Sequence, residues 1–164
     1  MSAGAIMKSP KASNMEVNKM LNENVKKLLE TSMWDLATCT NGEPNGVSVA
    51  FKFVTEDGKL AVGDVFLETT LNNIKANNGR IAISVYDGKS LEGYQIKGKA
   101  EYLTAGEIVD TFKQMVEKMF NGAATAKGAL LITPEKVIVT TPGADNKKAL
   151  MPLCTGLSRI SSPG

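Results

Sequence analysis

Alternating apolar and polar residues recur along most of the chain and predict short β-strands. The predicted strands cover residues 33–40, 46–54, 59–64, 80–86, 93–103, 128–133 and 136–140. Asn41-Gly42 separates the first two strands, and an Asn-Gly pair favours a two-residue hairpin because both residues tolerate positive φ. Gly98 lies inside the fifth strand, where a residue without a side chain indicates a bulge or a bend.

Three other segments place apolar residues at the spacing of an amphipathic helix. They cover residues 14–31, 70–77 and 105–120. Ser13 to Glu16 and Thr104 to Glu107 both fit the capping box, in which a small polar residue is followed three positions later by Glu. Six or seven short strands with two or three flanking helices predict a mainly β fold, an antiparallel barrel. Periodicity alone leaves open whether the sheet closes.

The length and composition favour one soluble domain. The chain has 164 residues, of which 43% are hydrophobic and 22% are charged, as in an ordinary globular protein. We expect the folded domain to cover residues 1–150 and residues 151–164, rich in Gly, Pro and Ser, to form a C-terminal tail. The net charge of +2 and the lack of a Lys/Arg cluster in the sequence argue against a nucleic-acid partner.

The sequence also predicts no membrane partner and a cytoplasmic location. No apolar run approaches the roughly 18 residues of a membrane span, and the N-terminal segment lacks the apolar region of a signal peptide. Cys39 and Cys154 match no metal-ligand spacing, and two cysteines this far apart predict no disulfide framework, which favours a reducing compartment.

The chemistry available to this chain is limited by a complete absence of histidine. Histidine is the commonest general base and the commonest metal ligand, so hydrolytic triads and zinc sites are poor hypotheses. We expect no metal site, and no catalytic residue can be named from the sequence.

Thr69 and Thr70 stand where a helix is predicted to begin, directly after the strand ending at Asp64. The first N–H groups of a helix have no intrahelical acceptor, so hydroxyl groups beside them form a ready anion site. Threonine at this place also caps helices without binding anything. Both interpretations remain open on this evidence, and one Thr can cap while the other binds.

The order and spacing of several segments carry a family resemblance over about residues 33–150. These segments are Gly42–Lys52, Gly63-Asp64 followed by Thr69–Ile74, Gly93–Glu101 and Thr141–Gly143. Together they resemble the FMN-binding split barrel of the pyridoxamine 5'-phosphate oxidase-like superfamily, in particular its small flavin-nucleotide-binding members. The resemblance implies an antiparallel split β-barrel and a homodimer that binds FMN at two clefts of the subunit interface.

The resemblance also implies which residues contact the cofactor. A strand beside the isoalloxazine ring corresponds to Val47, Ser48, Val49 and Ala50. A segment bordering the ring and the ribityl chain corresponds to Asp64, Val65 and Phe66. The phosphate-binding positions correspond to Thr69, Thr70 and Asn73, and Gln95 is expected to reach the flavin from the partner chain. Relatives often carry Lys or Arg where this chain has Thr69, so Lys52 is the first candidate for a replacement cation, followed by Lys75 and Lys97.

The function that this resemblance implies is that of an FMN-dependent oxidoreductase or electron-transfer protein, with a small redox partner or NAD(P)H as reductant. Such chemistry needs no histidine base, because the flavin carries it. Whether the protein turns over a substrate stays open. The alternatives are a non-catalytic flavin-binding protein and a deazaflavin-dependent reductase that uses the same cleft. Haem is disfavoured because the chain has no histidine ligand.

Overall fold

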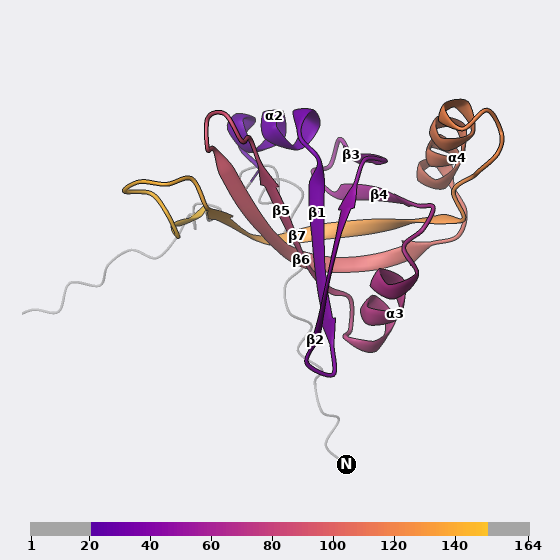
Figure 1. The fold of residues 1–164 in the computed structure, drawn as a ribbon, viewed down its shortest axis with the longest axis horizontal. Helices are drawn as coiled ribbons and strands as arrows, with labels where there is room; N and C mark the ends of the chain where they lie inside the picture. Colours follow the sequence, from indigo (N-terminus) through magenta and orange to yellow (C-terminus); the bar gives the residue numbers. More distant parts are fainter. Residues whose placement is uncertain (1–20, 151–164) are drawn as a thin grey trace, which may run out of the picture.

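One curled antiparallel sheet organises the chain (Figure 1). The structure is a computed structural model that describes residues 21–150. Its strands are β1 Trp34–Thr40, β2 Glu43–Val49, β3 Lys52–Val54, β4 Leu60–Asp64, β5 Arg80–Tyr86, β6 Gly93–Leu103, β7 Gly128–Val139 and β8 Ala149–Leu150. They follow the order β2-β1-β5-β6-β7-β4-β3, with β8 paired to β7. The expected mainly β, antiparallel split barrel is confirmed.

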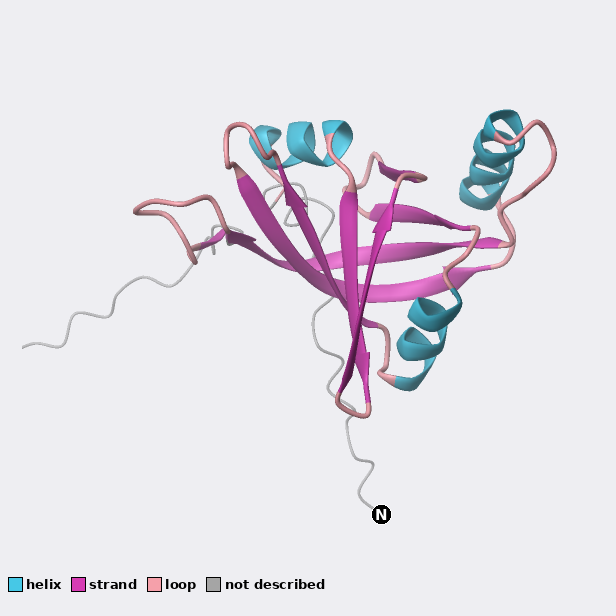
Figure 2. Ribbon diagram, viewed as in Figure 1, coloured by secondary structure: helices cyan, strands magenta, loops and turns pink. Residues whose placement is uncertain are grey.

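The first hairpin forms where the sequence predicts it. Thr40 pairs with Glu43, so Asn41 and Gly42 are the only loop residues between β1 and β2. Their φ angles are 53° and 77°, the left-handed values that a two-residue turn requires. The hairpin extends away from the rest of the sheet (Figure 2).

A bulge at Gly98 is also confirmed. Lys97 pairs with Lys136 and Gly98 with Pro134, which leaves Glu135 as an extra residue on β7. A Cβ at Gly98 would lie 2.4 Å from the Thr133 carbonyl oxygen, so only glycine fits. Because the bulge accommodates Pro134 within the ladder, β7 is one continuous strand, and the prediction of two separate strands around this proline is wrong.

The predicted strand 46–54 is divided into β2 and β3. β2 pairs with β1 up to Val49, and β3 pairs with β4 from Lys52 onward. Between them the Gly63 N–H donates to the Phe51 carbonyl at 2.9 Å. Val49 packs in the core inside the curled sheet, whereas Phe51 packs in the cluster under a helix on the outer side. The chain therefore changes partner strand and face while its alternation continues, which hides the break from sequence analysis.

Within residues 21–150, three helices flank the sheet: α2 Glu23–Thr31, α3 Glu68–Ala76 and α4 Glu107–Met119. Their ends differ from the predictions. Asn22 caps α2, accepting from the Val25 N–H at 3.0 Å, so the prediction of helix at residues 21 and 22 is wrong; Ser13 lies outside the described residues. Gly106 rather than Thr104 precedes α4, and no side chain caps it. Like α4, α3 begins without a side-chain cap, so only α2 among these three helices has one.

The helices cover different parts of the sheet (Figure 1). Apolar residues of α2 and α3 complete the core inside the curl, and α4 packs on the outer side of β4 and β7 through Val109, Phe112 and Val116. On the outer side of β1, β2 and β6, Ala37, Gly46 and Lys97 are exposed. This part of the outer face is therefore open within residues 21–150. No helix in that range is long and apolar enough to cross a membrane.

Candidate functional site at the start of α3

The start of α3 presents backbone donors that the helix itself does not use. The Leu71 N–H makes the first helical bond, to the Leu67 carbonyl at 2.8 Å, and no side chain caps the helix. The N–H groups of residues 68–70 therefore have no helical acceptor, and the helix dipole adds partial positive charge there. Thr69, which carries a hydroxyl group, is an exposed residue beside them. This arrangement can bind an anionic oxygen group, although Glu68 in the same turn opposes it.

Thr70 and Asn73 come together in a polar network that joins α3 to the β1–β2 hairpin. The Asn45 amide donates to Thr70 Oγ1 at 3.1 Å and to Thr38 Oγ1 at 3.3 Å. The Asn73 amide donates to Thr38 Oγ1 at 3.0 Å. Thr70 is only 2% exposed, so its hydroxyl faces this network more than solvent. Among the two threonines, Thr69 is the one open to a ligand.

Thr38 and Asn45 were missed by the sequence analysis. They are direct cross-strand partners in the predicted hairpin, and alternation places both on the inner face. The hairpin register, once fixed by Asn41-Gly42, would have paired them. Their contact with α3 depends on tertiary packing and had no local signal.

Asp64 holds the loop that leads into α3. Its Oδ1 accepts from the Leu67 N–H at 3.2 Å and its Oδ2 accepts from the Tyr102 hydroxyl at 2.8 Å. The side chain is 1% exposed, so in the folded chain it positions the helix rather than facing a ligand. Burial, and then the hydrogen bond to Asp64, raises the pKa of Tyr102 to about 12.

Val65 and Phe66, the two residues after Asp64, differ in their exposure to solvent. Val65 is buried in the cluster under α4, whereas Phe66 is 78% exposed. An aromatic ring this exposed, next to free helix donors, is available to contact a planar ligand. Phe66 is therefore the member of the segment 64–66 that the structure leaves open.

The residues expected beside the flavin ring lie on two faces of the sheet. Val47 and Val49 pack in the core. Ser48 is on the outer face and donates to Asp35 Oδ1. Gln95 lies in the same cross-strand row as Ser48, but β1 and β5 separate them, a span of about 14 Å at the usual strand spacing. Ala50 is exposed at the corner after β2.

Lys52 has partners other than the start of α3. Its ammonium donates to the Leu29 and Glu30 carbonyls at 2.5 and 3.0 Å and lies 5.3 Å from the centre of the Trp34 ring. Burial lowers the pKa of Lys52, and Glu30 partly offsets this effect. These contacts satisfy carbonyls in the last turn of α2, so Lys52 has a structural role. Its role as the phosphate cation stays a prediction.

Among the described residues, no group of histidine, cysteine, aspartate and glutamate side chains could hold a metal ion. The donors at the start of α3 are instead neutral N–H and hydroxyl groups. A family model described as pyridoxamine 5'-phosphate oxidase matches residues 21–142. The chain belongs to this family.

Several solved structures have a similar fold. HupZ of Group A Streptococcus is 24% identical, with 77% of this chain and 98% of that chain covered and a TM-score of 0.66. An FMN-binding protein of Syntrophomonas wolfei is 18% identical over 76% of this chain and 85% of that chain, with a TM-score of 0.59. An F420 reductase is 19% identical, with 68% of this chain and 94% of that chain covered and a TM-score of 0.53. These likenesses show the shared fold. No curated protein sequence matches the chain.

Proposed function

We propose that this family member is an FMN-binding flavoprotein, active as a homodimer in oxidoreduction or electron transfer. The observation that carries the proposal is the start of α3, where uncapped N–H groups and the hydroxyl of the exposed residue Thr69 form a donor set suited to a phosphate. The FMN-binding protein among the similar structures supports the same cofactor.

The residues of this chain bind and orient the cofactor in this proposal. The N–H groups of residues 68–70 and the Thr69 hydroxyl hold the phosphate. The Asn45 network fixes α3 against the hairpin that carries the flavin-side strand, so phosphate and ring positions are set relative to each other. Phe66 covers part of the ring. Bound FMN would supply the redox chemistry.

Two alternatives use the same donors. A non-catalytic flavin carrier would bind FMN but show no turnover with a reductant. The F420 reductase among the similar structures supports a deazaflavin as a second candidate, because that cofactor also carries an anionic tail.

A visible spectrum of the purified protein, recorded before and after adding FMN and desalting, tests the proposal first. We expect flavin absorbance at about one FMN per chain, and bleaching by NAD(P)H would separate an enzyme from a carrier. A colourless protein after desalting would contradict FMN as the cofactor, and retention of a deazaflavin instead would favour the second candidate. Light scattering with bound FMN tests the homodimer.

A pair of variants tests the phosphate contact. Thr69→Val keeps the shape of the side chain and removes the hydroxyl, which should weaken FMN binding by about 1–2 kcal/mol. Thr70→Val should weaken FMN binding by a similar amount if its hydroxyl also bonds the phosphate. Riboflavin lacks the phosphate and serves as the control ligand, so its affinity should not change. Equal losses for FMN and riboflavin would mean that the threonines support the fold only.

A further inference from the structure

Asp35 lies half-buried on the outer face of the sheet, directly opposite Ser48 in the β1–β2 hairpin. Its Oδ1 accepts a hydrogen bond from the Ser48 hydroxyl. The strand register places Ser84 on its other side and Gln95 beyond Ser84, so the four residues form one polar row across β2, β1, β5 and β6. Ser48 and Gln95, at the two ends of the row, correspond to flavin contacts in the family resemblance. The carboxylate therefore stands between two candidate flavin contacts.

The pairing pattern of the hairpin leaves the backbone of Ser48 free at the edge of the sheet. β2 is the first strand in the sheet order, so within residues 21–150 only one of its sides is paired. Thr40 and Glu43 close the two-residue loop as a hydrogen-bonded pair, and non-hydrogen-bonded pairs alternate with hydrogen-bonded ones from there. Pro44, which has no N–H, falls on a non-hydrogen-bonded pair, as this count requires. The Asp35–Ser48 pair is of the same kind, so the Ser48 N–H and carbonyl point away from β1, where a ligand can reach them.

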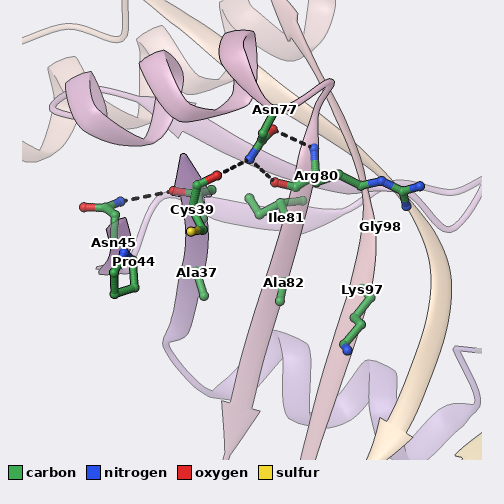
Figure 3. A pocket seen from close by; sticks show the side chains of 11 residues that line it. Ala37, Cys39, Pro44, Asn45, Asn77, Arg80, Ile81, Ala82, Lys97 and Gly98 are labelled. Atoms are coloured by element: carbon green, nitrogen blue, oxygen red, sulfur yellow. Dashed lines mark hydrogen bonds between the residues drawn. The ribbon is translucent and has the colours of Figure 1, made fainter. Parts of the chain in front are cut away.

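Asp35 is the only carboxylate on the outer face of β1, β2 and β5 in the part of the chain that the structure describes. Ala37, Ala82 and Lys97 form the neighbouring cross-strand row (Figure 3). At the usual strand spacings Lys97 is about 12 Å from Asp35, farther than the Debye length of about 8 Å at physiological salt. Within residues 21–150 Asp35 forms no ion pair. No cation among these residues therefore neutralises its charge.

We propose that Asp35 places a negative charge beside the flavin ring of bound FMN and so favours the oxidised form of the cofactor. This inference rests on the proposed function. Two-electron reduction leaves negative charge on a flavin ring whenever fewer than two protons accompany the electrons, and a nearby carboxylate repels that charge. The repulsion is stronger where water is excluded, as in a cleft between two subunits. Asp35 acts through its charge and by orienting the Ser48 hydroxyl, so it is a positioning residue.

The reduction potential of protein-bound FMN, measured at equilibrium against a redox dye of known potential, tests this role. The difference from free FMN gives the ratio of the affinities for reduced and oxidised cofactor. In Asp35→Asn this ratio should rise at least tenfold over wild type, which corresponds to a potential about 30 mV higher. Asp35→Ser, a second neutral substitution, should shift the potential in the same direction. Asp35→Glu keeps the charge and should keep a potential close to that of wild type.

Two control variants separate the position of the charge from other effects. Asp110→Asn removes an equal charge from the exposed first turn of α4 and should leave the potential unchanged. Ser48→Ala removes the hydroxyl but keeps the carboxylate, so its potential should stay nearer to wild type than to Asp35→Asn. Urea unfolding of the apoproteins measures any loss of hairpin stability separately.

The outcomes distinguish this inference from the proposed function. Equal potentials in wild type and Asp35→Asn, with FMN retained by both, would overturn the inference and leave the proposed function standing. In that case a lower stability of Asp35→Asn alone would show that the bond to Ser48 serves only the hairpin. An equal rise in potential for Asp110→Asn would show that net charge alone matters and would also overturn the inference. Failure of the wild type to retain FMN would overturn both.

Discussion

The hydrogen bond between the Tyr102 hydroxyl and Asp64 stabilises the entrance to α3, and its removal should have a measurable cost. Tyr102→Phe keeps the ring and deletes the donor to Oδ2 at 2.8 Å. Asp64 then retains only the Leu67 N–H among its recorded donors, inside a site that is 1% exposed. A hydrogen bond to a charged group contributes about 1.5–3 kcal/mol, because the buried partner cannot regain water.

Urea unfolding of the wild type and of Tyr102→Phe measures this difference directly. We expect the free energy of unfolding to fall by about 1.5–3 kcal/mol, with an unchanged m-value because the fold is the same. Tyr86→Phe is the matched control, since Tyr86 is 59% exposed, and it should change stability by less than about 0.5 kcal/mol. If Tyr102→Phe costs no more than Tyr86→Phe, the Asp64 contact does not stabilise α3.

The pH dependence of the same pair of proteins gives an independent check. The pKa of Tyr102 is raised from 10.0 to about 12 in the folded chain, so the folded state holds this proton more tightly than the unfolded state. The resulting stabilisation is fully present below pH about 10 and is lost as the pH rises towards 12. The stability gap between wild type and Tyr102→Phe should therefore be constant up to about pH 9 and narrow above it. A gap that widens in this range would contradict the assignment.

Three further substitutions test the packing described above. Gly98→Ala should destabilise the chain by about 3 kcal/mol in urea unfolding, because its Cβ would meet the Thr133 carbonyl oxygen at 2.4 Å; a near-wild-type midpoint would contradict the bulge. Lys52→Met should cost about 1–2 kcal/mol through lost contacts with the last turn of α2, and Lys52→Arg should restore part of it. Phe112→Ala should cost about 3–5 kcal/mol, since this ring is fully buried under α4 and stacks on Phe53 at 4.9 Å; a thermal melt shifted by only a degree or two would show that α4 packs loosely.

Local signals predicted much of the sheet. Asn41-Gly42 and Gly98 constrain the backbone by themselves, so the hairpin and the bulge could be read from the sequence. The break after Val49 could not, because the alternation continues through it while the partner strand changes. The start of α2 at Asn22 was not predicted either, because the apolar spacing of the expected helix 14–31 continues through this residue.

The candidate site was predictable only in part. Thr69 and Thr70 were located by the helix pattern, but their different exposure depends on Asn45, which comes from a hairpin distant in sequence. Lys52 carried no sign that its ammonium would bond the carbonyls of α2. Each of these contacts joins segments that are distant in the sequence and forms only in the folded chain.

The bulge on β7 also affects which insertions and deletions the barrel can tolerate during evolution. Glu135 has no cross-strand partner in the ladder, so deleting it would leave Pro134 and Lys136 facing Gly98 and Lys97 as before. Yet Glu135 supplies the carboxylate that pairs with Arg80. Deleting this one residue would therefore remove one negative charge, and the partner of Arg80, from the surface, and it would also remove the bulge that accommodates Pro134 in the ladder.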